Sequence, residues 1–403
     1  MKKINSTKIN SSIINKFIRL MSKFDYQASI KKAVLRCITT FILIILITFI
    51  GGCSAMKQIE EDTISQLSFS HDGKKVVFDR CRNEGCQIQV YDLETGELAA
   101  YQSPQNERWS MGKYSYDGKS ITFSVFPIKS NDDLDLGNMQ IAVMDADGKN
   151  FKKVTTGPGA KLYPAFSHNG KKILYACAAR IREKGKTPAA DYDAWEVNLE
   201  TGEQTQLTFF KYFYMGNLTY FPDDERYIYY GELPEVFEGV KSYQNETAFK
   251  QKMIELAKKG MGIHAVVVMK GKEMIPKIYN FGDKVVPEKP LLSKDGSVLI
   301  FEKSASAGKF YQYSTDGNHR LVVQVGSVDS AAISPDGKYM GRCNGETISV
   351  LRVSDGTAYR GIVLRHSDYA RRSENLDELV RKMPQLRILQ EMPSQIVTIK
   401  NQY

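Results

Sequence analysis

Short apolar runs alternate with tight polar turns along most of the chain, and the pattern repeats. The stretch "FSHDGKKVVF" at 69–78 returns as "YSYDGKSITF" at 114–123 and as "FSHNGKKILY" at 166–175. Asp-Gly or Asn-Gly between β-branched and aromatic runs is typical of a β-hairpin. Fixed self-similarity indicates a repeat architecture. Six copies recur at intervals of 41 to 72 residues, with turn positions at Gly73, Gly118, Gly170, Asp224, Gly296 and Gly337.

Each copy predicts four antiparallel strands, here called A to D. The first turn joins A to B, and a second turn such as "LETG" at 93–96 or 199–202 joins C to D. Five residues after the first turn, most copies place an aromatic residue in strand B: Phe78, Phe123, Tyr175, Tyr229 and Phe301, with Arg342 breaking the pattern. One such sheet leaves both of its faces unburied, whereas six sheets around an axis cover one another. We therefore predict an all-β, six-bladed β-propeller of four-stranded antiparallel blades over 63–364.

Insertions between strands B and C are expected at 126–139, 178–194 and 232–262. The third insertion has a helical pattern, because Phe249, Met253 and Leu256 fall on one helix face. That face either packs on the propeller or docks a partner. In the tail, 365–403, we expect a short helix and one further strand, which either closes the ring against the first blade or covers an outer edge.

The order of these motifs resembles the TolB-like propeller repeat. "KVTT" at 153–156 and "QLT" at 206–208 match its blade ends, and "AISPDGK" at 332–338 is close to its turn. The resemblance covers about residues 63–363. It implies the propeller architecture and protein binding on one propeller face, here the face of the B–C loops. TolB-family proteins carry an α/β domain before the propeller, for which the linker 53–62 leaves no room.

The N-terminal region is expected to direct export. Residues 1–36 are basic, 37–56 are uncharged, and the apolar run ends in "IGGC" at 50–53. This ending resembles the bacterial lipobox, which implies that 1–52 is a lipoprotein signal peptide and that Cys53 is acylated. An uncleaved inner-membrane anchor is the alternative, and Met21 is an alternative start. Since Ser54 is not the Asp that favours inner-membrane retention in lipoproteins, we expect a periplasm-facing outer-membrane location.

Charge and candidate metal ligands narrow the function classes. The whole chain has a net charge of +9, and residues 1–52, with nine Lys or Arg and one acid, contribute +8 of it. The remaining residues 53–403 therefore have a net charge of only +1, which gives no reason to expect nucleic-acid binding. The carboxylates Asp132, Asp133 and Asp135 lack the Gly and the distal Glu of an EF-hand loop, so a solvated loop is favoured over a Ca²⁺ site. We expect no metal and no cofactor other than the lipid.

The cysteines suggest one cross-link. Cys81 ends strand B and Cys86 starts strand C of the first blade, so a disulfide is predicted, with free thiols or a half-built metal site as alternatives. Cys177 and Cys343 are expected to be buried strand residues.

No catalytic motif is present: the sequence has no G-x-S-x-G, H-E-x-x-H, P-loop or G-x-G-x-x-G. His71 and His168 occupy the same repeat position, which favours a structural role. We therefore expect a lipid-anchored exported propeller that acts as a protein-binding scaffold in the bacterial cell envelope. The alternative is a carbohydrate-active or hydrolytic propeller enzyme with its site at the channel mouth.

Overall fold

The structure is a computed structural model of the chain. It describes residues 63–82, 85–129, 133–181, 189–212, 214–232, 251, 254–255, 264–275, 287–303, 309–313, 319–324, 330–364, 381, 386–389 and 396–398. Cys53 and the predicted docking residues Phe249, Met253 and Leu256 lie outside this set. Within it, no helix has the length and apolarity needed to cross a membrane.

The strands form six separate sheets, and each sheet follows chain order from strand A to strand D. The first three blades contain β1 (Thr63–Phe69), β2 (Lys75–Arg82), β3 (Gly85–Asp92) and β4 (Leu98–Gln102); β5 (Glu107–Tyr114), β6 (Ser120–Pro127), β7 (Gln140–Asp145) and β8 (Lys152–Lys153); and β9 (Ala160–Phe166), β10 (Lys172–Ile181), β11 (Ala189–Asn198) and β12 (Gln204–Gln206). The last three contain β13 (Met215–Tyr220), β14 (Arg226–Glu232), β15 (His264–Lys270) and β16 (Glu273–Ile275); β17 (Pro287–Leu292), β18 (Leu299–Lys303), β19 (Lys309–Tyr313) and β20 (His319–Gln324); and β21 (Ser330–Ile333), β22 (Tyr339–Cys343), β23 (Thr347–Arg352) and β24 (Ala358–Leu364).

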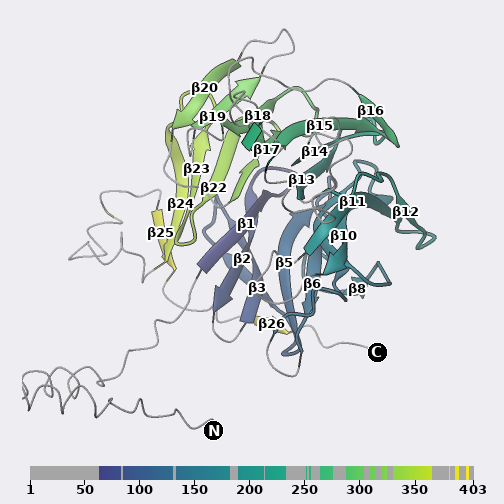
Figure 1. Cartoon of the computed structure of the whole chain (residues 1–403). Helices are drawn as coiled ribbons and strands as arrows, with labels where there is room; N and C mark the ends of the chain where they lie inside the picture. Colours follow the sequence, from purple (N-terminus) through teal and green to yellow (C-terminus); the bar gives the residue numbers. More distant parts are fainter. Residues whose placement is uncertain are drawn as a thin grey trace, which may run out of the picture. The chain divides into compact units, whose positions relative to one another are not determined.

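The six inner strands form a closed ring. Each A strand contacts the A strands of both neighbouring blades, and β1 and β21 complete the circle. Figure 1 shows β1 beside β22, where the first and last blades meet. This junction includes hydrogen bonds from the Ile64 amide to the Gly345 carbonyl (2.7 Å) and from the Leu67 amide to the Ser330 hydroxyl (3.0 Å). The predicted six-bladed propeller of four-stranded antiparallel blades is confirmed.

The C-terminal tail adds two short strands to outer edges. Strand β25 (Leu386–Leu389) pairs in parallel with β24 of blade 6, and β26 (Ile396–Thr398) pairs in parallel with β4 of blade 1. The tail therefore covers an outer edge on each of the two blades that close the ring. Covering such an edge removes a template for pairing with another chain.

The core lies between blades, where the aromatic residues of strand B are buried. Phe78, Phe123, Tyr175 and Tyr229 are at most 1% exposed. One cluster joins blade 1 to blade 2, with Trp109 at its centre stacked on Phe151 (5.1 Å between ring centroids). Burying such rings between blades stabilises their packing.

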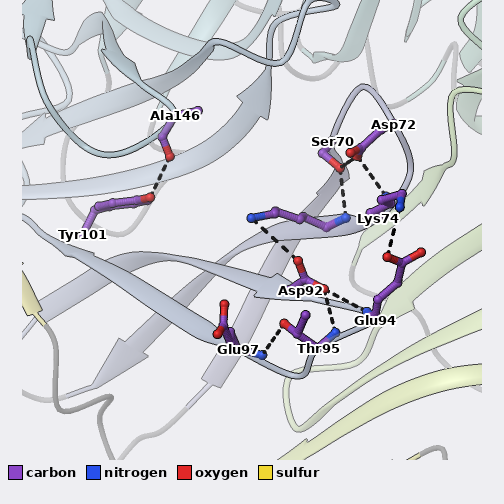
Figure 2. A network of polar contacts seen from close by, with 10 residues as sticks. Ser70, Asp72, Lys74, Asp92, Glu94, Thr95, Glu97, Tyr101 and Ala146 are labelled. Carbon is purple, nitrogen blue, oxygen red and sulfur yellow. Dashed lines mark hydrogen bonds and ion pairs between the residues drawn. The ribbon is translucent and has the colours of Figure 1, made fainter.

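The repeated Ser-x-Asp-Gly turn is stabilised by its own side chains. In blade 1 the Ser70 hydroxyl donates to the Asp72 carboxylate (2.6 Å), which also accepts from the Lys74 amide (3.0 Å), as Figure 2 shows. The Lys74 ammonium in turn meets Glu94 of the C–D turn at 3.0 Å. The same Ser–Asp or Ser–Asn bond recurs in the first turn of blades 2, 3, 5 and 6. Such turns favour Asp, Asn and Gly because they need short acceptors and positive φ.

Two features of the blades differ from expectation or extend it. The predicted insertion at 178–194 is too long, since the β10–β11 ladder continues to the pair Ile181–Ala189 and leaves 182–188 as the connection. Small buried residues such as Ala178 and Ala194 allow this extension. In blade 4, Asp224 takes the left-handed turn conformation (φ 56°) that Gly adopts elsewhere. Its carboxylate accepts the amides of His168 and Asn169, which ties blade 4 to the turn of blade 3.

Candidate functional site

The outer strand of blade 3 bulges outward directly after β12. The bulge at 208–211 is held by Asp193 of β11, whose Oδ1 accepts the Thr208 hydroxyl (2.9 Å) and the amides of Phe210 (2.7 Å) and Lys211 (3.2 Å). Beyond the bulge, Tyr212 pairs with Tyr192 through reciprocal backbone bonds of 2.7 and 2.9 Å. The segment is thus fixed at both ends.

Asp193 is a buried carboxylate, 4% exposed. Burial raises its pKa to about 6, although the hydrogen bonds from Thr208, Lys211 and Phe210 favour the charged form. Desolvation therefore outweighs the donors. The folded state therefore favours the protonated form of Asp193.

The bulge presents Phe209 to solvent. Its side chain is 63% exposed, the largest exposure among the large hydrophobic residues that the structure describes as exposed. The Lys272 ammonium lies 5.6 Å from the centre of the Phe209 ring. We call residues 208–211 the Phe209 bulge.

A groove of about 610 Å³ runs between blades 3 and 4 next to Lys272. Its wall carries two ion pairs, Lys172–Glu196 (2.9 Å) and Lys270–Glu225 (3.0 Å). The Tyr220 hydroxyl also donates to Glu196 (3.0 Å). The exposed Phe209 ring thus lies next to Lys272, which lines a groove with charges of both signs.

The second candidate is a cavity of about 160 Å³ on the propeller axis, lined by residues of all six inner strands. Five inner strands carry a bulge residue with positive φ, seven positions before the first-turn residue: Gln66, Met111, Tyr163, Asn217 and Lys289. The left-handed conformation costs a non-glycine residue roughly 1 kcal/mol. Three of these residues, Gln66, Tyr163 and Asn217, line the cavity. Because the same position is strained in five blades, this conformation is a feature of the blade repeat.

Comparisons with known proteins add the fold relationship. No protein-family model matches the sequence, and no curated protein matches it. TolB from Acinetobacter baumannii is similar at 19% identity and TM-score 0.46, covering 66% of this chain and 56% of that chain. An oligogalacturonate lyase in complex with manganese is similar at 16% identity and TM-score 0.46, covering 74% of this chain and 77% of that chain. An acylaminoacyl peptidase from Pyrococcus horikoshii is similar at 16% identity and TM-score 0.46, and the match covers 80% of this chain and 46% of the peptidase chain.

This chain is a six-bladed β-propeller, and TolB proteins are among its structural neighbours. It spans little more than half the length of the Acinetobacter protein. At these identities the likeness concerns the fold alone.

The structure places the predicted cysteine pair together. Cys81 and Cys86 face each other across the β2–β3 ladder, with Cα atoms 4.0 Å apart, and are joined in a disulfide. The bond in the exported protein stays a prediction. Cys177 and Cys343 are buried, as predicted.

Other candidates have local structural partners. Tyr116 stacks on His168 at 3.6 Å between ring centroids, which agrees with a structural role for this repeat position. Asp135 accepts from the Asn138 side chain (2.8 Å) and lies 3.7 Å from Lys129. Asp132 lies outside the described residues. Among those that the structure describes, no three His, Cys, Asp or Glu residues gather as a metal site.

Neither the Phe209 bulge nor the axial cavity was predicted from the sequence. The only sequence trace of the bulge is the pair Phe209–Phe210 directly after the blade-end "QLT". The predicted insertion at 178–194 includes Asp193, which the structure instead places in strand β11.

Proposed function

We propose that the chain is a lipid-anchored, exported β-propeller that docks a protein partner in the bacterial cell envelope. The observation that carries this proposal is the Phe209 bulge, in which a 63% exposed aromatic side chain stands on backbone fixed by the buried Asp193. Interface hot spots are rich in large anchor side chains, and an anchor held in place beforehand loses little entropy on binding.

The groove beside the bulge supplies specificity. Its Lys172–Glu196 and Lys270–Glu225 pairs offer charges of both signs around the aromatic anchor. Such pairs at a rim steer and align a partner more than they add affinity. The partner we propose is therefore a protein with an apolar pocket for Phe209 and a complementary charged border.

Anchoring and location rest on the N-terminal sequence. The "IGGC" stretch supports acylation at Cys53, and Ser54 supports the periplasm-facing outer membrane. The Cys81–Cys86 pairing supports export, since disulfides persist in oxidising compartments. The B–C loops, with Phe249, Met253 and Leu256, remain a second proposed contact region.

The test compares two exposed apolar residues. Phe209→Ala is expected to leave unfolding unchanged within about 0.5 kcal/mol, because the side chain is largely exposed. Recovery of crosslinked partners from native membranes should fall at least about tenfold, as for a hot spot. Leu321→Ala is the matched control, since Leu321 is 48% exposed on the outer strand β20 of blade 5. Equal recovery by wild type and both variants would reject docking at the bulge.

A further inference from the structure

The charged side chains that line the axial cavity are all basic. Among the described residues, those that line it include half-buried Lys113 and the exposed His71 and Lys294, and no Asp or Glu. The remaining lining groups are hydroxyls, amides and apolar side chains, such as Gln66, Ser330 and Leu291. The charge that this wall presents is therefore positive.

Lys113 extends along the axis from blade 2. Its ammonium donates to the Leu218 carbonyl of blade 4 at 3.1 Å, past the intervening blade 3. Burial lowers the pKa of Lys113 to about 8, with no charged neighbour contributing. The Lys113 side chain is half-buried, and no carboxylate is among its hydrogen-bond partners in the described residues. An anion beside a partly desolvated ammonium would recover part of the desolvation cost.

Nearby carboxylates are already engaged. Asp79 of blade 1 accepts the Ser110 hydroxyl (2.5 Å) and the Met111 amide (2.9 Å). Asp72, beside His71, accepts from the Ser70 hydroxyl and the Lys74 amide.

Glu302 of blade 5 meets Lys289 at 2.8 Å. Each of these acids thus has its own local partner, and none belongs to the cavity wall.

Lys294 spans the turn end of the same cavity. It extends from the first turn of blade 5, and its ammonium donates to the Tyr116 carbonyl of blade 2, the opposite blade, at 2.8 Å. The Tyr116 hydroxyl lies 3.4 Å from the Thr219 hydroxyl of blade 4. These contacts across the axis place a second ammonium at the end of the cavity.

We propose that the axial cavity is a binding site for a small oxyanion, a phosphate or a short carboxylate, held by Lys113 and Lys294. A cavity of about 160 Å³ has room for a molecule on the order of five to ten heavy atoms. The oxyanion replaces the carbonyl partners of the two ammonium groups with charge-assisted hydrogen bonds. The site is independent of docking at Phe209, so either can fail without the other.

The experiment uses the full chain, with inorganic phosphate and succinate as separate probes. Each is titrated against sodium chloride of equal ionic strength while thermal unfolding is followed. We expect a saturable rise in Tm with at least one probe. Lys113→Met should weaken its binding at least about tenfold, the value of a lost charge-assisted bond. Lys149→Met is the control, because Lys149 is 74% exposed and pairs with Asp147 outside the cavity.

A second readout needs no variant. The apparent affinity of wild type should fall as the pH rises above about 8, where Lys113 loses its proton. No response beyond sodium chloride with either probe would overturn the proposal. So would a Lys113→Met variant that binds as wild type does, or an affinity that stays constant from pH 7 to pH 9.5.

Discussion

Replacing Asp193 with Asn should change the pH dependence of stability in a defined direction. Asp193 is the buried acceptor that fixes the Phe209 bulge, and burial raises its pKa from 3.8 to about 6. Because the folded-state pKa is the higher one, the fold favours the protonated form. The resulting stabilisation is fully present below the unfolded pKa and is lost as the pH rises through about 6.

The magnitude follows from the size of the shift. A rise of about two units corresponds to about 3 kcal/mol between the two limits. Between pH 4 and pH 7 about 2.4 kcal/mol of this is realised, since the unfolded Asp is partly protonated at pH 4. The side-chain amide that Asp193→Asn introduces does not titrate. The free energy of unfolding of wild type minus that of Asp193→Asn should therefore fall by about 2.4 kcal/mol from pH 4 to pH 7.

Urea unfolding at pH 4, 5.5 and 7, followed by the fluorescence of Trp109 and Trp195, gives the required free energies. Equal m-values in wild type and variant show that the denatured state is unchanged. Asp295→Asn is the control of opposite sign. The Ser293 hydroxyl and the Ser297 donors hold the pKa of Asp295 at about 2, so it stabilises the fold above its unfolded pKa and loses that contribution as the pH falls.

The reasoning would be refuted if the difference in the free energy of unfolding between wild type and Asp193→Asn stayed constant from pH 4 to pH 7. It would also be refuted if this difference increased with pH, because the hydrogen bonds donated to Asp193 would then outweigh its desolvation.

Three further predictions concern export, cross-linking and the largest insertion. Cys53→Ala should abolish acylation and leave unprocessed precursor; undiminished acyl labelling of that variant contradicts the lipid anchor. Non-reducing peptide mapping of exported protein should find Cys81 and Cys86 in one fragment, and replacing both with Ser should cost about 2 kcal/mol for so short a loop; free alkylation of both thiols in unreduced, denatured protein rules the bond out. Deleting 236–259 should leave cooperative unfolding intact, since a short turn can join strands B and C, whereas an insoluble product would indicate that the insertion covers the blade.

The blades could be predicted from the sequence because each depends on local chemistry. The Ser70–Asp72 bond and the positive φ of Gly73 need only neighbouring residues, and the same letters recur in other blades. The aromatic residues Phe78, Phe123 and Tyr175 mark the buried face of strand B. Hairpin repeats of this kind contain the information for their own fold.

The candidate sites could not be predicted because their contacts are not local. The Leu218 carbonyl that Lys113 reaches is 105 residues away along the chain, and Lys294 reaches the Tyr116 carbonyl across 178 residues. The sequence around Asp193 resembles a polar loop, and only its donors at 208–211 show it to be a buried strand residue. Contacts between blades and across the axis depend on the closed ring, which no single repeat specifies.

Photo-crosslinking at the Phe209 bulge tests the docking proposal most directly. A benzophenone amino acid replaces Phe209 in the full chain, preserves an exposed aromatic ring and is irradiated in native membranes. The same amino acid at Leu321 of β20 is the control for exposure without the bulge. Docking at the bulge predicts a discrete crosslinked protein at position 209 that is absent at position 321. Identical patterns at both positions, or no protein crosslink at position 209, would contradict it.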